Sequence, residues 1–319
     1  MLVPRSILAL LAFAAATAAA QSWPTKPVKI VVAFTAGGTS DIMARTVAVR
    51  LTERYKQSFV VENRPGAGGN IGTEAVVRSA PDGYTLLMNS VGPIAVNPTL
   101  YKNLGYDPLA DLVPIVQVSD VPNVLIVHPS IGVKSVDELV AYGKANPGKL
   151  NYASTGVGTS SHLSSFMLAS RGGFSATHVP YKGAEALKDV LAGRIQFMFA
   201  TIPSVIGHIK AGTLVALAVS STKRSRSLPD VPTVADSGFP GFEAGSWFGL
   251  FAPRGTPASI VAEINKSVNE IVADRAIEAK MIEEGADPVG GSPEKFAAFV
   301  RSEFEKWRTV VRESGASVD

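Results

Sequence analysis

The stretch KIVVAFTAGGTSDIMARTVAVR, residues 29–50, decides the fold. Its apolar, β-branched beginning, Lys29 to Phe34, predicts a buried strand, and the glycines that follow predict a turn with almost no side chain. Thr39 or Ser40 is expected to cap a helix whose apolar positions recur at helical spacing. Because glycine leaves the first backbone N–H groups of that helix open, the turn is expected to attract an anion.

The order of strand, small-residue turn and helix recurs along the chain. Apolar runs predict further strands at 59–61, 84–88, 150–153, 177–180, 195–200, 214–220 and 247–252. The expected helices are 71–78, 135–144, 162–169, 184–192, 201–210, one that opens at 256–257, and 293–313. Such alternation predicts a parallel sheet with helices on both faces, and ligands of such sheets bind at the carboxyl ends of the strands.

Two extended apolar runs, 113–118 and 123–127, are expected to carry the chain from a first sheet into a second. The last long helices are most simply placed back on the first unit, so the chain crosses between the units twice. We therefore predict an α/β protein with lobe 1 at 21–122 and 245–319, lobe 2 at 123–244, and a ligand cleft between the two lobes.

The first 20 residues have the three regions of a secretory signal peptide, namely Arg5, an apolar run over 7–13 and small residues that end at Ala20. The sequence therefore predicts cleavage after Ala20 and a periplasmic protein. The chain contains no cysteine, which excludes disulfides and a cysteine nucleophile. Its net charge of +3 is small and its basic residues are dispersed, which argues against nucleic acid or an anionic membrane as a partner.

The sequence patterns of catalysis and metal binding are missing. There is no G-x-S-x-G and no H-E-x-x-H, and the four histidines lack metal-ligand spacing. The glycines at 66–69 lack the lysine and the full pattern of a nucleotide-binding loop. We therefore expect no cofactor, no metal and no enzymatic activity. The alternative is a serine hydrolase that uses Ser154 or Ser160 with His162.

Short blocks of sequence spread over the whole chain after residue 20 resemble one known family. They are 34–38 with Asp41, 61–69, 81–86, 146–150, 154–162, 178–183, 229–233, 247–249 and 256–257. In this order and spacing they are similar to the substrate-binding proteins of tripartite tricarboxylate transporters, the Bug receptors. The resemblance implies a fold like that of type II periplasmic binding proteins, with the ligand in a cleft between two lobes.

The function that this resemblance implies is capture of a small organic carboxylate by lobe closure. The receptor would then deliver the ligand to the membrane subunits of a tripartite tricarboxylate transporter. We expect a monomer. A periplasmic ligand sensor that docks on a membrane regulator is the alternative of the same chemistry.

The resemblance also implies which residues hold the ligand, mainly through backbone amides and hydroxyl groups. In lobe 1 they are Phe34, Ala36, Gly37, Gly38 and Ser90, and in lobe 2 they are Ser154, Thr155, Gly158, Thr159, Tyr181, Lys182 and Gly183. His162 and Ala200 complete the predicted site. Ala200 is a departure from the family, which often has an acid there that would meet an amino group, so it argues against an amino-acid ligand.

Three polar residues near these turns have a second interpretation. Asp41 is better explained as an acid that stabilises the start of a helix, because it would repel a carboxylate ligand. Lys182 is either a solvated turn residue or a partner for an anion. His162 either packs within its own lobe or reaches the cleft.

Overall fold

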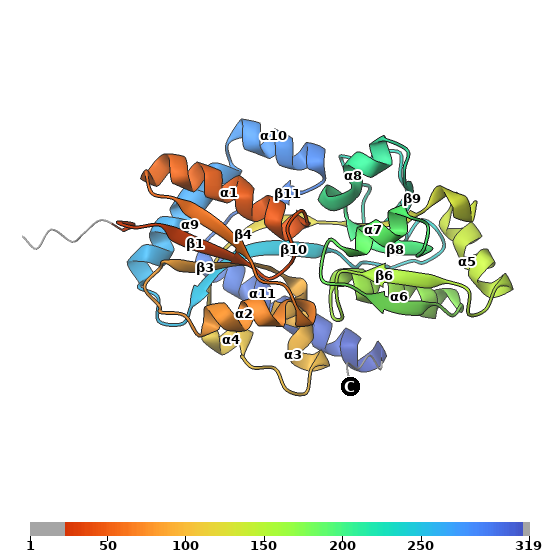
Figure 1. Cartoon of the computed structure of the whole chain (residues 1–319), viewed down its shortest axis with the longest axis horizontal. Helices are drawn as coiled ribbons and strands as arrows, with labels where there is room; N and C mark the ends of the chain where they lie inside the picture. Colours follow the sequence, from red (N-terminus) through yellow and green to blue (C-terminus); the bar gives the residue numbers. More distant parts are fainter. Residues whose placement is uncertain (1–22, 315–319) are drawn as a thin grey trace, which may run out of the picture.

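The computed structural model describes residues 23–314, and the predicted signal peptide at 1–20 lies outside the described residues. Two sheets flanked by helices lie side by side along the long axis of the molecule (Figure 1). Each sheet buries apolar side chains against its helices, which is the usual way in which an α/β protein forms its core. The fold is therefore the expected α/β fold with two lobes.

The first sheet has six strands in the order β11-β4-β10-β3-β1-β2. Their bounds are β1 Val28–Val32, β2 Phe59–Asn63, β3 Thr85–Ser90, β4 Leu112–Val121, β10 Ser246–Pro253 and β11 Asp287–Pro288. Strands β1, β2 and β3 are parallel, as the alternation of strand and helix predicts, whereas β10 runs antiparallel to both β3 and β4. Helices α1 Thr39–Tyr55 and α2 Asn70–Val77 make the crossovers between the parallel strands.

The second sheet has five strands in the order β7-β6-β8-β5-β9. Their bounds are β5 Asn123–Val127, β6 Asn151–Ser154, β7 Thr177–Pro180, β8 Phe197–Thr201 and β9 Val215–Val219. The helices that belong to it are α5 Val136–Ala145, α6 Ser160–Gly172, α7 Ala186–Leu191 and α8 Ile202–Lys210. Because β6 is parallel to β7 and β8, the turns that follow these strands meet at one edge of the sheet.

Two extended segments join the sheets. Strand β4 passes through Pro122 directly into β5, and the chain returns to the first sheet at Ser246, where β10 begins. The last helices are α9 Ala258–Val272, α10 Arg275–Glu284 and α11 Pro293–Ser314, and α9 and α11 pack on the first sheet. The exact division of the chain into lobes at 122 and 245 stays a prediction.

Several short elements between the strands are absent from the sequence-based assignment. They are the π-helix Gly92–Val96, α3 Asn97–Leu100, α4 Pro108–Asp111, the 3-10 turns at 67–69 and 129–131, helix α10 and strand β11. The start of α10 has a local signal, because the Asp274 side chain accepts hydrogen bonds from the N–H groups of Ala276 and Ile277. Strand β11 has only two residues and depends entirely on pairing with β4.

The start of α1 also differs from the prediction. The N-cap residue of α1 is Gly38, which has no side chain and therefore makes no capping hydrogen bond. The expectation that Thr39 or Ser40 is the cap is wrong. Both hydroxyl residues instead lie buried in the first helical turn. This shift by one residue leaves their backbone N–H groups at the very start of the helix, where no intrahelical partner exists.

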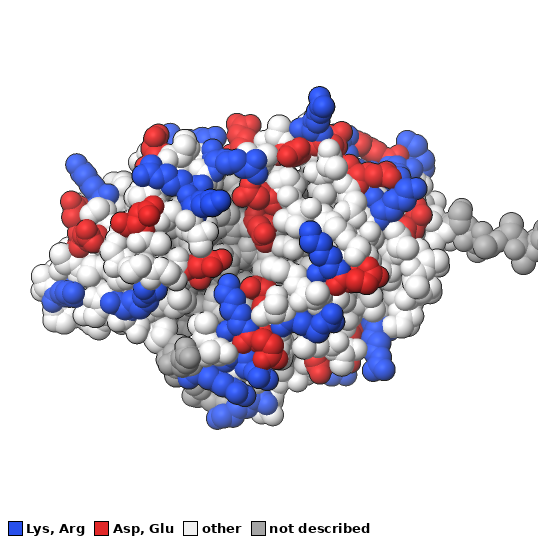
Figure 2. Space-filling model, turned by 180° about the vertical axis from the view of Figure 1, so that it is seen from behind, with Lys and Arg blue, Asp and Glu red and all other residues white. Residues whose placement is uncertain are grey.

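The surface carries charges of both signs in mixed order. On the face seen in Figure 2, Lys and Arg side chains are interspersed with Asp and Glu side chains over the whole outline. Many of them form exposed ion pairs within one helix, such as Arg50 with Glu53 and Arg78 with Glu74. Among the described residues, no helix is both long enough and apolar enough to span a bilayer.

Candidate functional site

A cavity lies between the two sheets, at the edges where the strand-to-helix turns of both lobes meet. It encloses about 660 Å³ of space between atoms, part of which is open to solvent. Hydroxyl residues are its largest group, namely Thr39, Ser40, Ser90, Thr155, Thr159, Ser160, Thr201, Ser204 and Ser246. The other lining residues are Phe34, Gly37, Gly38, Gly183, Ala184, Leu187, Met198, Ala200, Val205 and Phe248. No lining residue carries a charge, so any bound anion must be held by hydroxyls and backbone dipoles.

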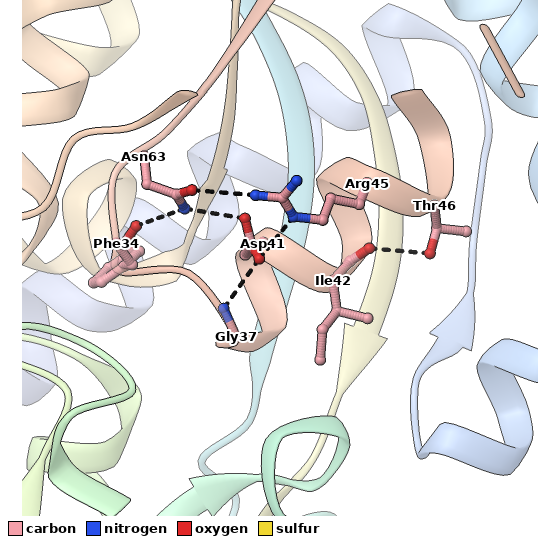
Figure 3. Close-up of polar contacts among 7 residues, drawn as sticks. All are labelled: Phe34, Gly37, Asp41, Ile42, Arg45, Thr46 and Asn63. Atoms are coloured by element: carbon pink, nitrogen blue, oxygen red, sulfur yellow. Dashed lines mark hydrogen bonds and ion pairs between the residues drawn. The ribbon is translucent and has the colours of Figure 1, made fainter. Parts of the chain in front are cut away.

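On the lobe 1 side the cavity is bordered by the first loop, residues 33–38, which connects β1 to α1. Asp41, in the first turn of α1, binds to this loop (Figure 3). Its carboxylate accepts hydrogen bonds from the Gly37 N–H at 3.0 Å, from Arg45 Nε at 2.9 Å and from Asn63 Nδ2 at 3.1 Å. Asn63 Nδ2 also donates to the Phe34 carbonyl at 3.0 Å. One buried carboxylate thus ties together both ends of the loop.

The ionised form of Asp41 is favoured by these contacts. Burial by itself raises the pKa of this carboxyl, but hydrogen bonds from Arg45, Gly37 and Asn63 outweigh burial and hold the pKa below its usual range. The carboxylate is therefore charged at neutral pH and fully engaged. Asp41 does not line the cavity, which agrees with the interpretation that it stabilises the start of α1.

The hydrogen bond from the Gly37 N–H to Asp41 leaves other backbone amides of the first loop and of the start of α1 to bind a ligand. Gly37 borders the cavity, but its N–H points to the carboxylate rather than into the space. The N–H groups of Gly38, Thr39 and Ser40 have no hydrogen-bond partner among the described residues. These three consecutive amides, at the positive end of a 17-residue helix, are suited to an anion.

On the lobe 2 side lies the second loop, residues 155–159, which connects β6 to α6. Uncharged groups hold it. Ser154 Oγ lies 2.6 Å from His178 Nε2 and accepts from the Gly156 N–H, and His162 Nδ1 accepts from the Gly158 N–H at 3.3 Å. Thr159 caps α6, because its hydroxyl accepts from the His162 N–H and donates to the Gly156 carbonyl. All of these hydrogen bonds, which hold the second loop in place, join uncharged groups.

Two histidines support the second loop as a stacked pair. The rings of His162 and His178 lie 4.0 Å apart between centroids and 12° from parallel, and Tyr152 stacks on His178. Burial lowers the pKa of His162 to about 4, and burial together with the neighbouring His162 lowers the pKa of His178 to about 3. Both rings are therefore neutral at pH 7, which is the form that accepts the loop's hydrogen bonds.

The contact between Ser154 and His178 has the residue types of a hydrolase but not the geometry. Ser154 is fully buried and does not line the cavity, so its Oγ has no path to a substrate. Among residues 23–314 no carboxylate hydrogen-bonds to either ring, so nothing orients His178 as a general base. The contact of Ser154 with His178 and with the Gly156 N–H supports the second loop.

The two lobes touch each other around the cavity. Thr39 Oγ1 in lobe 1 lies 2.7 Å from Thr201 Oγ1 in lobe 2, and the Ala184 N–H donates to Thr35 Oγ1 at 2.9 Å. Glycines make the closest approaches. A Cβ on Gly183 would lie 2.6 Å from Thr35 Oγ1, and a Cβ on Gly158 would overlap the side-chain oxygen of Asn97. The structure therefore represents a closed arrangement of the lobes.

Three serine residues of the lining have hydroxyl groups without a protein partner among the described residues. Ser40, Ser90 and Ser246 line the cavity, and each is at least nine-tenths buried, with 4%, 7% and 6% of its surface exposed. Their Oγ atoms have no hydrogen-bond partner among the described residues. Among the described residues, the fully enclosed side-chain atoms without a partner are Trp23 Nε1, Asn97 Oδ1 and Ser119 Oγ. The three serine hydroxyls are not in that group, so they are open to the cavity and can bond to a ligand or to water there.

The residues predicted to form the site divide into two groups by position. Eight of them line the cavity, namely Phe34, Gly37, Gly38, Ser90, Thr155, Thr159, Gly183 and Ala200. The other six, Ala36, Ser154, Gly158, His162, Tyr181 and Lys182, do not line it. Gly158 belongs to the second loop, Ser154 and His162 support it by hydrogen bonds, and Tyr181 and Lys182 border a separate groove. Their contact with a ligand stays a prediction.

Sequence reasoning missed most of the lining residues at the end of β8, at the start of α8 and in β10. Thr201 and Ser204 had a usable signal, because they stand at a strand-to-helix junction like the other turns of the site. Ser246 and Phe248 had none, since their position depends on the antiparallel pairing of β10 with β3. Among the described residues no group of His, Asp or Glu is arranged to hold a metal ion.

Comparison with known proteins gives a consistent result along the whole chain. The family described as the tripartite tricarboxylate transporter family receptor matches residues 43–316. BugT of Bordetella pertussis is 40% identical over 306 residues, which is 95% of this chain and 94% of that protein.

Among solved structures, R. palustris Rpa4515 with adipate is 39% identical with a TM-score of 0.90, over 92% of this chain and 98% of that one. The periplasmic binding protein BugD is 37% identical with a TM-score of 0.89, over 92% and 99% of the two chains.

Proposed function

This chain belongs to the tripartite tricarboxylate transporter family of receptors, and on that premise we propose that it captures a small organic carboxylate between its lobes. The observation that carries the proposal is an uncharged cavity whose lining includes the hydroxyls of Ser40, Ser90 and Ser246, none of which bonds to another described residue. The adipate bound to Rpa4515, a protein of the same fold and 39% identity, supports a carboxylate as the ligand.

The first turns of three helices supply the positive potential of the site. The N-termini of α1, α6 and α8 open onto the cavity through Thr39, Ser160 and Thr201. A helix N-terminus carries roughly half a positive charge, and a hydrogen bond to a charged group contributes about 1.5–3 kcal/mol. Four or five such bonds, reduced by the cost of association, are enough for a micromolar Kd, about −8 kcal/mol. An arginine clamp is unnecessary.

The residues that we propose to contact the ligand are the cavity-lining ones from both lobes. Gly38, Thr39 and Ser40 offer amides, and Ser90, Thr155 and Ser246 offer hydroxyls. Because they come from both lobes, a ligand in the cavity bridges them. Binding is therefore coupled to closure, which is supported by the contact of Thr39 with Thr201 at the border of the cavity.

Export to the periplasm and delivery to membrane subunits are further parts of the proposal. The n-, h- and c-regions within residues 1–20 support cleavage after Ala20, and BugD, a relative of similar fold, is a periplasmic binding protein. The family description supports a tripartite tricarboxylate transporter as the partner. We expect a monomeric receptor without enzymatic activity or cofactor.

Titration calorimetry of the mature protein with unsubstituted mono- and dicarboxylates tests the proposal. We expect micromolar or tighter binding of at least one acid, and a loss of at least tenfold in affinity for Ser90→Ala. Thr309→Ala, on the exposed face of α11, is the matched control for removal of a hydroxyl. Absence of binding by every acid in the series, with the protein folded by circular dichroism, would contradict the proposed function.

A further inference from the structure

We infer that the cavity selects a dicarboxylate whose body is hydrocarbon and rejects acids that carry an ammonium group. The inference rests on the proposed function and goes beyond it by naming the class of ligand. Two independent features of the lining carry it, namely the sign of the electrostatic potential and the position of the apolar side chains.

The cavity has no charged side chain in its lining, and three helix N-termini border it. The lining contains neither Asp nor Glu, and the nearest buried carboxylate, Asp41, is neutralised by Arg45 and turned toward Gly37. The dipoles that face the cavity are the N-termini of α1, α6 and α8, all positive ends. An ammonium group would leave water without gaining a carboxylate partner and would face three positive dipole ends.

The total positive potential also limits the charge of the ligand. Three helix N-termini at roughly +0.5 each amount to about one and a half charges, which matches a dianion better than a trianion. The unpartnered hydroxyls of Ser40, Ser90 and Ser246 add neutral donors. These hydroxyls can donate hydrogen bonds to the carboxylates of a ligand but add no positive charge. The negative charge of a third carboxylate would therefore not be balanced by any group of this lining.

The wall between these polar groups is apolar. Phe34, Leu187, Met198, Val205 and Phe248 all line the cavity, together with Ala184 and Ala200. Met198 and Val205 are buried and belong to β8 and α8 of lobe 2, whereas Phe34, after β1, and Phe248, in β10, come from lobe 1. Each methylene that such a wall removes from water increases affinity about fourfold, which favours an unsubstituted chain between the two carboxylates.

A trio of ligands of matched shape tests the inference. Hexanedioate, 2-methylhexanedioate and 2-aminohexanedioate are titrated into the mature protein at pH 7.5 by calorimetry. Methyl and ammonium groups are similar in size. The affinity of the methyl compound relative to hexanedioate therefore measures the effect of the added volume, and the affinity of the amino compound relative to the methyl compound measures the effect of the added charge. We expect the methyl compound to bind within tenfold of hexanedioate and the amino compound to bind at least 30-fold more weakly than the methyl compound.

A charge placed in the lining tests the cause. Leu187 lies half-buried on α7, borders the cavity and packs against the core of lobe 2, so Leu187→Glu adds a carboxylate to the lining and also removes apolar packing. We expect this variant to reduce the preference for the methyl over the amino compound by at least tenfold. Leu187→Gln, of the same length but uncharged, is expected to keep the preference.

The possible results separate the inference from the proposed function. Equal affinity for the methyl and amino compounds overturns the inference while the proposed function stands, and so does a preference that Leu187→Glu leaves unchanged. Tighter binding of a tricarboxylate such as propane-1,2,3-tricarboxylate than of any dicarboxylate overturns it as well. Failure of every carboxylate to bind overturns the proposed function and the inference with it.

Discussion

The first loop, 33–38, and the second loop, 155–159, do the same work by opposite means. Each connects a strand to a helix at the border of the cavity. The first is held by a charged residue, Asp41, which is compensated by Arg45 on the far side of the loop. The second is held by the neutral rings of His162 and His178 and by hydroxyls.

The difference teaches how a cavity for an anion is kept free of competing charge. In the first loop the Asp41 carboxylate accepts hydrogen bonds from three donors, one of them the charged Arg45, so its negative charge is balanced and repels a bound anion less. In the second loop burial keeps both histidines unprotonated, so they add no positive charge and accept hydrogen bonds instead. The glycines differ too, because a Cβ on Gly37 would meet nothing within 4 Å, whereas Gly158 is pressed against the opposite lobe.

The largest expected effect is that of Gly158→Ala. The new Cβ would overlap Asn97 and approach Leu100 of lobe 1, so the closed arrangement would be blocked while each lobe stays folded. We expect affinity for the carboxylate to fall at least 100-fold in calorimetry. Gly132→Ala is the matched control, because Gly132 has a similar positive φ, 75° against 79°, and open space around it. Equal affinities for the two variants would contradict the role of Gly158 in closure.

The next effect concerns the charged support of the first loop. Asp41→Ala leaves Arg45, the Gly37 N–H and Asn63 without their shared acceptor, and we expect a loss of about 2–3 kcal/mol in the free energy of unfolding. Glu53→Ala removes an acid of the same helix that forms only an exposed ion pair, and it is expected to cost less than about 0.5 kcal/mol. Urea denaturation of both variants measures the difference, and similar losses would show that the network carries no special weight.

Mild acid is expected to distinguish the two loops. A histidine whose folded pKa lies below its unfolded value of 6.5 makes the unfolded state bind more protons between the two values. Stability is therefore complete above pH 6.5 and falls as the pH drops toward 4, by about 1–2 kcal/mol from His162 between pH 7 and 5. Asp41 has its pKa lowered from 3.8, so its contribution is lost only at more acidic pH.

Urea titrations at pH 7 and pH 5 check this window. In His162→Gln the difference in unfolding free energy between the two pH values is expected to shrink, whereas His208→Gln, at the end of α8 and outside both loops, is expected to keep it. An unchanged pH dependence in His162→Gln would show that the stacked pair does not couple protonation to folding.

The smallest expected effect lies at the helix caps. Thr159 caps α6 with its side chain, so Thr159→Ala is expected to cost about 1 kcal/mol in the absence of ligand. Gly38 caps α1 without a side chain, and a Cβ there has room, with the nearest atom at 3.7 Å. Gly38→Ala is therefore expected to change stability by less than about 0.5 kcal/mol in the same denaturation experiment. A reversed order would mean that the loops are not held as described.

The amino-acid sequence by itself determined the α/β class, most strands and the turns that border the cavity. Local patterns are enough for this, because β-branched runs, glycine pairs and helix-capping residues act over a few residues. Ser135 illustrates it, since its hydroxyl accepts from the Glu138 N–H and starts α5 where the pattern S-x-x-E predicts. The place of Phe34, Gly38, Ser90 and Thr159 on the cavity follows from the same rule, since each stands next to the end of a strand or the start of a helix.

Only the tertiary structure decided which groups face the ligand and which support the loops. Asn63 reaches Asp41 and the Phe34 carbonyl from β2, and His178 reaches Ser154 from the neighbouring strand β7. Ser246 and Phe248 enter the cavity because β10 returns antiparallel beside β3, a pairing between residues more than 150 positions apart. Such contacts depend on which strands pair within each sheet, and no pattern of neighbouring residues encodes that pairing.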